Sequence, residues 1–478
     1  MRFCSLVWIL LAAQVYAAPY PPELVPGPLV IVGGGKVPEA ARTEFAKLAG
    51  GEKAKVVVLS GDSADRKTAD TAEFAKPLAE AMGLWFEGDS QKLVEAYRGT
   101  ATGKAILELH KRGGVIGAPA ELFDAVKGFD CLPGVVIAES KRLSKLADVI
   151  EKNPESAGLG IDEGTALILT QGRFFKIVGT GGVTTVLASS PTRVSFAESQ
   201  KSGAIDLFQI RRAAHFRAMQ EQFPSAKPAE PKVSKGALLI VGGGGAGPEI
   251  WKTFIELAGG PEFPIVVVSS ANEDPVPVDT GEAKALRNFG AKKVKILHTR
   301  DRKEADSEAF TAILKEAKGV WFTGGRHWRF VDSYEGTLSE KRFREVLERG
   351  GVIGGSSAGA SIQAEYMPRG HPLGNTVVAA EGYERGFGYL PGCAVDQHFF
   401  ARKRTADMTG LMKQYPQLLG IGIDEGTGLV VKGSTAEVIG KSKVAFYDTR
   451  TKPKEGEKDY IEVPSGGKYD LAERKKVD

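Results

Sequence analysis

Short runs of apolar residues alternate along the chain with longer amphipathic stretches. In the C-terminal half the runs are rich in β-branched residues and lack polar alternation, which predicts strands buried on both faces, as in a parallel sheet. These strands are expected over residues 238–241, 265–268, 293–297, 319–322, 351–354 and 428–431. Helical periodicity predicts helices over 248–258 and 338–348. The pattern therefore predicts an α/β protein with three α/β/α layers and mostly parallel sheets, followed by an antiparallel strand over 443–447.

The sequence of the first half recurs in the second half. Residues 29–35 are LVIVGGG, and residues 238–244, which begin 209 positions later (238 − 29), are LLIVGGG. Other blocks recur in the same order, among them 85–86 with 321–322, 112–117 with 349–354, 132–134 with 390–392 and 160–165 with 422–427. The spacing is far longer than a solenoid repeat. It predicts a tandem duplication into two homologous domains.

We expect the first domain over residues 28–221 and the second over 236–450. Residues 222–235 between them are polar and rich in proline, which predicts an exposed, semi-rigid linker. Residues 451–478 form a charged tail that is rich in glycine and proline. This tail is expected to hold a last strand or to be partly disordered.

Residues 1–17 have the pattern of a secretory signal peptide. Arg2 precedes an apolar run over 6–13, and the small residues Val15 and Ala17 predict cleavage before Ala18. We therefore expect a secreted or periplasmic protein, the alternative being a first core strand or helix. No later apolar run is long enough to span a bilayer, so no membrane partner is expected. The formal net charge of +4 comes without a basic block, so no nucleic-acid partner is expected either.

Four glycines at 242–245 follow the predicted strand that ends at Val241. Their spacing fits a dinucleotide fingerprint only loosely, and Ser269-Ser270 stands where that fingerprint has an acidic residue. A simple strand-to-helix turn is favoured over a nucleotide site, and no cofactor is expected. The Cys and His spacings predict no metal site.

A serine lies at a sharp turn between a predicted strand and a predicted helix. Residues 355–359 are GSSAG, a Gly-x-Ser-x-Gly motif centred on Ser357. Such a turn exposes the serine as a nucleophile, and nearby backbone N–H groups stabilise an oxyanion. We expect these donors to be Ala358, which follows the serine, and Gly325 in the Gly-Gly turn after strand 319–322.

His398 follows another apolar strand and is the candidate general base for Ser357. The alternative is an ordinary surface or capping histidine. In the first half, the spacing of 237 (349 − 112) aligns Ala120 with Ser357, and the spacing of 258 (390 − 132) aligns Ser140 with His398. Both candidates are therefore missing together from the first half, which favours a shared role in the second half.

The second half resembles the cyanophycinase and dipeptidase E family of serine peptidases. The resemblance rests on the Phe-Thr-Gly-Gly turn at 322–325, the elbow at 355–361, the Asp-Gln-His-Phe segment at 396–399 and the segment LGIGIDEGT at 419–427. It implies a flavodoxin-like, class I glutamine-amidotransferase-like fold, hydrolysis through an acyl-enzyme on Ser357, and a β-linked Asp–Arg substrate. It also implies that the substrate pocket is lined by Asp396, Gln397, Arg402 and Arg404.

Several positions depart from the family pattern. Arg326 and His327 stand where an amide is usual, so they are included among the substrate-binding candidates. No carboxylate follows the serine at the usual spacing, so we expect Asn375, or alternatively Glu381, to orient His398. Asp424 and Glu425 recur in the first half as Asp162 and Glu163, and a structural role as a turn cap is favoured for them.

The favoured hypothesis is an exported serine peptidase that acts on peptide or isopeptide bonds, with the first half replacing a second subunit in an intramolecular pseudo-dimer. The alternative is a non-catalytic binding or scaffold protein. An esterase of the α/β-hydrolase type is disfavoured, because such enzymes place the histidine much further downstream.

Overall fold

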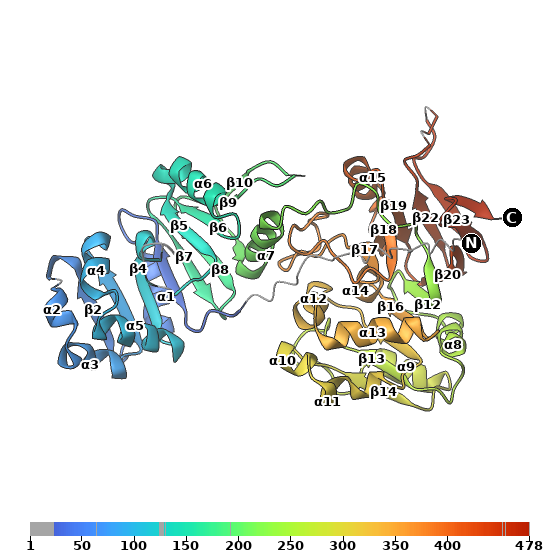
Figure 1. Ribbon diagram of the computed structural model, residues 1–478, viewed down its shortest axis with the longest axis horizontal. Coiled ribbons are helices and arrows are strands. Elements are labelled where there is room, and N and C mark those ends of the chain that lie inside the picture. The colour runs from blue at the N-terminus through green and yellow to red at the C-terminus, as the bar shows by residue number, and fades with distance from the viewer. Residues whose placement is uncertain are drawn as a thin grey trace, which may run out of the picture.

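The computed structural model of the protein describes residues 23–63, 65–123, 129, 131–191, 193–451, 453–454 and 456–477. The predicted signal peptide, residues 1–17, lies outside the described residues. The chain forms two lobes: the blue-to-green first half and the yellow-to-red second half lie side by side (Figure 1). No helix among the described residues is long and apolar enough to cross a bilayer.

The first half contains two sheets. In spatial order, the larger sheet consists of β11 (Ala204–Asp206), β8 (Phe174–Gly179), β7 (Thr165–Thr170), β1 (Leu29–Val32), β4 (Val115–Pro119), β3 (Gly83–Glu87) and β2 (Val56–Ser60). The smaller sheet consists of β10 (Phe196–Gln200), β9 (Val183–Leu187), β6 (Ala157–Ile161) and β5 (Val135–Glu139). In the larger sheet β1, β4, β3 and β2 pair in parallel, whereas β7, β8 and β11 are antiparallel additions.

The second half also contains two sheets. The larger consists of β14 (Val294–Leu297), β13 (Ile265–Val268), β15 (Gly319–Phe322), β16 (Val352–Ser356), β12 (Val233–Val241), β20 (Thr427–Gly433), β21 (Thr435–Gly440), β24 (Lys468–Asp470) and β25 (Lys475–Val477). The smaller consists of β17 (Ala364–Tyr366), β18 (Leu390–Gln397), β19 (Leu419–Ile423), β22 (Lys443–Tyr447) and β23 (Ile461–Pro464). The strand orders β2-β3-β4-β1-β7-β8 and β13-β15-β16-β12-β20-β21 correspond one to one.

Helices cover the sheets. Those of the first half are α1 (Glu39–Leu48), α2 (Arg66–Ala69), α3 (Ala72–Glu80), α4 (Ser90–Tyr97), α5 (Ala101–Lys111), α6 (Leu143–Lys152) and α7 (Leu207–Ala218). Those of the second half are α8 (Pro248–Leu257), α9 (Gly281–Asn288), α10 (Arg302–Ala305), α11 (Glu308–Thr311), α12 (Trp328–Tyr334), α13 (Leu338–Glu348), α14 (Ala358–Ser361) and α15 (Thr405–Gln414).

The larger sheet of the second half is buried on both faces. Trp321 and Val267 pack against Trp251 and Phe254 of α8 on one face. Phe322 and its neighbours pack against α12, α13 and the smaller sheet on the other. Because both faces are covered, the strands carry continuous apolar runs, and the pattern located most of them. The α/β fold class is confirmed.

One strand differs from the predictions. The run at 428–431 forms an antiparallel strand, β20, because it returns beside β12 without a crossover helix. In the tail beyond 450, where a last strand was one of the two expected outcomes, the chain forms β23, β24 and β25, which continue both sheets. Tyr469 of β24 is fully buried and stacks on Phe446 with ring centroids 3.9 Å apart.

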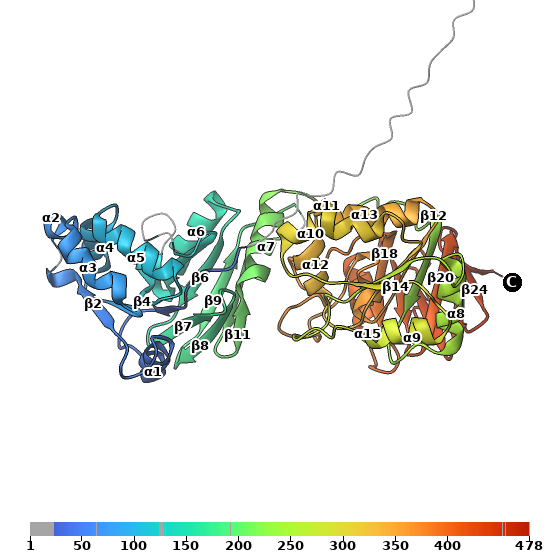
Figure 2. The same cartoon turned by 90° about the horizontal axis from the view of Figure 1, so that it is seen from below.

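The two halves meet through α7 and a layer of buried arginines. Both views show α7 between the lobes (Figures 1 and 2). Arg173 pairs with Asp332 at 2.6 Å, and Arg212 with Glu335 at 2.8 Å. Arg217 pairs with Glu381 at 2.7 Å. Each pair joins a cation of the first half to a carboxylate of the second, so the contact is specific as well as buried.

Candidate active site

Ser357 lies between β16 and α14 in a strained backbone conformation. Its φ is +55° and its ψ is −111°. A residue with a side chain rarely adopts a positive φ, and such strain is common where a nucleophile is held at a strand–helix elbow. The Ser357 N–H donates to the Val241 carbonyl at 3.0 Å, which fixes the elbow to the end of β12. The side chain remains partly exposed.

The structure brings Ser357, His398 and Glu425 into one hydrogen-bonded relay. The Ser357 hydroxyl lies 3.0 Å from Nε2 of His398, and Nδ1 of His398 lies 2.6 Å from Oε1 of Glu425. With the proton assigned to Nδ1, the ring donates to the carboxylate and accepts from the serine. This is the arrangement of a nucleophile, a base and an orienting acid.

The three side chains come from the carboxyl ends of strands in two different sheets. Ser357 follows β16 in the larger sheet, whereas His398 and Glu425 follow β18 and β19 in the smaller one. The glycine turn after β12 joins them: the His398 N–H donates to the Gly242 carbonyl at 2.7 Å. The site therefore forms only where the two sheets converge.

The same turn must be made of glycine. A Cβ on Gly243 would lie 2.4 Å from Cε1 of His398, and one on Gly244 would lie 2.5 Å from Cβ of Glu425. Both residues also have positive φ angles, +101° and +68°. The run at 242–245 thus makes room for the base and the acid, as a turn rather than as a nucleotide fingerprint.

His398 is 7% exposed, and this burial is the main cause that lowers its pKa below the usual value. The Glu425 carboxylate opposes this shift, while Arg402 reinforces it. The imidazole is therefore neutral at neutral pH and able to accept a proton from Ser357.

Two backbone donors lie beside the serine. Ala358 is the first residue of α14, so its N–H has no acceptor within the helix. The turn at Gly324 and Gly325 also lies close to the serine, since a Cβ on Gly324 would lie 3.6 Å from Cβ of Ser357. The structure thus brings both predicted oxyanion donors, Ala358 and Gly325, to the nucleophile's end of the sheet.

The prediction of Asn375 or Glu381 as the orienting residue is wrong. The Asn375 carbonyl accepts from Arg369, and Glu381 pairs with Arg217 at the contact between the halves. Glu425 holds the ring instead. A structural role was expected for both Asp424 and Glu425, but only Asp424 has it. Its carboxylate caps a turn by accepting from the Ala401 N–H at 3.0 Å and from the Ser442 hydroxyl at 2.8 Å.

Three of the predicted substrate-binding side chains lie beneath the site. Asp396, Gln397 and Arg404 are between 1% and 4% exposed. Asp396 accepts from Arg404 at 2.8 Å and from Arg369 at 3.0 Å, so its charge is already neutralised. These residues support the strand end that carries His398, and a substrate does not reach Asp396 as we expected.

The remaining substrate candidates differ in exposure. Arg402 is exposed in the turn that follows His398, where its backbone N–H donates to the His398 carbonyl at 3.0 Å and its guanidinium is available to a ligand. Arg326 is half-buried and donates to the carbonyls of His371 and Gly374, so it anchors a loop. His327 is buried with its Nε2 2.9 Å from the Pro368 carbonyl, and burial lowers its pKa to about 4. It is therefore a neutral ring that supports the same loop.

In the first half the strand registers place other residues at these positions. Val32 pairs with Pro119 as Val241 pairs with Ser356, so Ala120 takes the position of Ser357. Glu139 pairs with Ile161 as Gln397 pairs with Ile423, so Ser140 takes that of His398. Within the described ranges, no group of three or more His, Cys, Asp and Glu side chains is arranged to hold a metal ion.

Comparisons with known proteins agree with this geometry. The model of peptidase family S51 matches residues 238–439, which include Ser357, His398 and Glu425. The cyanophycinase of Trichormus variabilis (strain ATCC 29413 / PCC 7937) is 33% identical over 239 residues, or 48% of this chain and 79% of that protein. The chain belongs to peptidase family S51. The predicted family resemblance is thereby confirmed.

Another cyanophycinase and two solved structures match parts of the chain. The cyanophycinase of Synechococcus elongatus is 30% identical over 261 residues, or 51% of this chain and 78% of that protein. A peptidase from an acI-B1 actinobacterium is 22% identical, with a TM-score of 0.37 over 50% of this chain and 98% of that one. A putative peptidase E protein from Listeria monocytogenes EGD-e is 14% identical, with a TM-score of 0.32 over 45% of this chain and 100% of that one.

Proposed function

We propose that the protein is a serine-type peptidase that works through an acyl-enzyme on Ser357, with His398 as general base and Glu425 as the acid that orients it. The observation that carries the proposal is the continuous relay of 3.0 Å and 2.6 Å between these side chains. Family membership supports the reaction class.

The relay defines each proton transfer. The Ser357 oxygen attacks the scissile carbonyl carbon while its proton moves to Nε2 of His398. Glu425 stabilises the imidazolium, and the N–H groups of Ala358 and Gly325 face the developing oxyanion. His398 then gives the proton to the leaving amine, which departs and leaves the acyl group on Ser357. In the second step a water molecule attacks the acyl carbon while His398 takes its proton, and His398 returns this proton to the Ser357 oxygen as the acid product leaves.

For the substrate we propose peptide or isopeptide bonds of the β-linked Asp–Arg kind. The similar proteins are named cyanophycinases, and the exposed Arg402 offers a charge-assisted hydrogen bond to a substrate carboxylate. The alternative of a non-catalytic binding or scaffold protein rests on two departures, the lack of an orienting acid at the usual spacing and Arg326-His327 in place of an amide. Glu425 supplies an acid beside His398, which removes the first of these grounds. We also propose that the protein is exported, with a mature N-terminus at Ala18, which mass spectrometry of the secreted protein tests.

A fluorophosphonate probe and an assay on β-Asp–Arg dipeptide and polymer test the proposed chemistry. We expect the wild-type protein to be labelled once, at Ser357, and Ser357→Ala to lose labelling and about 10⁴-fold or more of kcat/KM while its thermal unfolding is unchanged. Ser356→Ala is the matched control, because it changes the neighbouring serine. Normal turnover by Ser357→Ala would refute the proposed mechanism.

A further inference from the structure

We propose that the first half contains a binding site of its own for a basic amino-acid residue, free or at the end of a short peptide, in a cavity at the strand ends where Ala120 takes the place of the nucleophile. The cavity measures about 1040 Å³ and lies within the first half alone. Its volume is at the upper end of the range for small-ligand sites. The proposal goes beyond the peptidase reaction of the second half.

The cavity lies at the carboxyl ends of strands of both sheets of the first half. Its walls include Gly34, Gly88, Pro119 and Glu139, which lie at the carboxyl ends of β1, β3, β4 and β5. Ligands of open α/β sheets bind in the crevice at these strand ends. The corresponding strand ends of the second half carry Ser357 and His398, so the cavity lies where the second half has its relay.

The lining of the cavity has more carboxylates than guanidinium groups. The cavity carries five carboxylates, those of Glu87, Asp89, Glu95, Glu121 and Glu139. It carries three guanidinium groups, those of Arg42, Arg98 and Arg142. The excess of carboxylates favours a ligand with a guanidinium or ammonium group, and Arg42 and Arg142 offer partners to the carboxylate end of the same ligand. An amino acid with a basic side chain meets both conditions.

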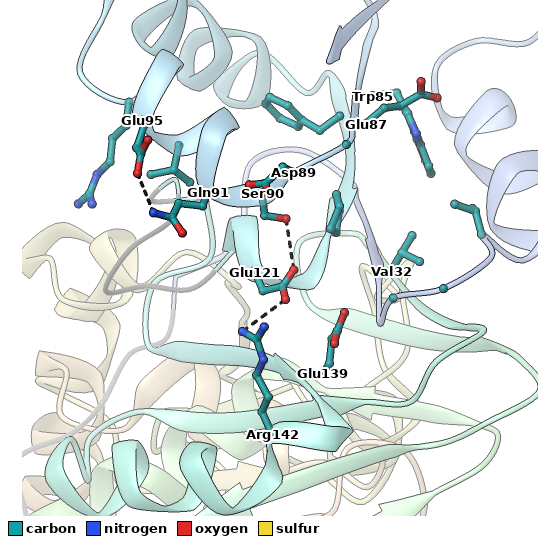
Figure 3. A pocket seen from close by; sticks show the side chains of 18 of the residues that line it. Val32, Trp85, Glu87, Asp89, Ser90, Gln91, Glu95, Glu121, Glu139 and Arg142 are labelled. Atoms are coloured by element: carbon teal, nitrogen blue, oxygen red, sulfur yellow. Dashed lines mark hydrogen bonds and ion pairs between the residues drawn. The ribbon is translucent and has the colours of Figure 1, made fainter. Parts of the chain in front are cut away.

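The centre of the cavity shows where the cation is expected. Figure 3 shows Glu121 between Ser90 and Arg142, and Glu139 on the wall of the same cavity. Glu121 accepts from the Ser90 hydroxyl at 3.2 Å and lies 3.5 Å from Arg142, a distance longer than a normal hydrogen bond. Glu139 is largely buried and forms an ion pair with Lys141.

The cavity has apolar walls and lacks the serine and histidine of the second half's relay. Trp85, Phe86 and Val32 line the cavity and provide surface against which an aliphatic side chain packs. Ala120 stands at the nucleophile's position. A Cβ on Gly34 would lie 2.5 Å from Oε1 of Glu139. Gly243 is the matching residue of the second half, and a Cβ there would meet the His398 ring instead. A carboxylate has thus taken the place beside the turn where the second half has its base, which suits binding of a cation without hydrolysis.

Isothermal titration calorimetry in a Ser357→Ala background tests the site, since that background stops turnover. We expect L-arginine to bind, and L-citrulline, which has the same shape without the charge, to bind at least about tenfold more weakly. Glu121→Gln combined with Glu139→Gln should weaken L-arginine binding by the same factor or more. Glu52→Gln, at an exposed turn outside the cavity, is the matched control and should bind like the background.

Two outcomes would overturn the proposal. One is that L-arginine gives no saturable heat; the other is that its affinity is unchanged in the double variant, which would place the ligand elsewhere. If the double variant does not fold, Glu87→Gln on the exposed wall replaces it, with the same expected direction. Because binding heat does not depend on catalysis, failure of the proposed peptidase function would leave this result unaffected.

Discussion

The proton affinity of His398 sets the pH range in which Ser357 is a nucleophile. Burial and the exposed Arg402 both lower the pKa of this ring, so it remains a neutral base below the pH at which an ordinary histidine becomes charged. We predict that Arg402→Gln raises this pKa and moves the acid limb of the kcat/KM profile to higher pH. Lys413→Gln, an exposed cation on α15, is the control. An acid limb that stays in place or moves to lower pH would contradict the electrostatic account.

Glu425 acts on the reaction through His398. We predict that Glu425→Gln lowers kcat by about 10⁴-fold, because the amide no longer favours the reactive tautomer or stabilises the imidazolium, while KM changes little. Steady-state kinetics on the dipeptide measure both constants. The first half provides a matched control, since Glu163 occupies the equivalent sequence position and Glu163→Gln is expected to leave kcat unchanged. Equal losses in the two variants would show a purely structural role.

The turn after β12 is the element that determines whether the relay closes. We predict that Gly243→Ala lowers kcat by about 100-fold or more, because the new methyl group would displace the His398 ring. Gly245→Ala is the control: its φ of +89° carries a similar backbone strain, but nothing lies within 4 Å of the added Cβ. If both variants lose the same activity, strain rather than displacement is responsible. A crystal structure of Gly243→Ala would show the ring position directly.

At the element scale, most of the second half was predictable because its strands are buried on both faces. The pattern located β13 and β15 to the residue, and the Gly-x-Ser-x-Gly spacing located the elbow at Ser357. It could not locate Glu425 as the acid, because that contact depends on β18 and β19 lying side by side. Because Glu163 is present in the first half, which lacks the serine and the histidine, its counterpart Glu425 was assigned a structural role and its contact with His398 was not predicted. The burial of Asp396 depends likewise on Arg369, which lies on a loop 27 residues earlier.

At the scale of the whole molecule, the contact between the halves is the feature that distinguishes this chain from a single-lobed peptidase. We propose that the first half takes the place of a partner subunit, as an internal pseudo-dimer. The matching strand orders and the buried arginines of α7 support this. Arg212 is 1% exposed and donates to both carboxylate oxygens of Glu335, at 2.8 Å and 3.1 Å, and to the Gly382 carbonyl at 2.7 Å.

Breaking this pair should therefore destabilise the assembly of the two halves. We predict that Arg212→Ala lowers the free energy of unfolding by about 3–5 kcal/mol, because it leaves the Glu335 carboxylate in a largely buried site without its partner. Arg212→Met combined with Glu335→Leu should restore much of the loss, since no unpaired charge is then buried. Urea unfolding followed by circular dichroism measures both effects, with Lys145→Ala on the exposed face of α6 as the control. A double variant that is as unstable as Arg212→Ala would show that packing of the arginine, and not charge pairing, holds the halves together.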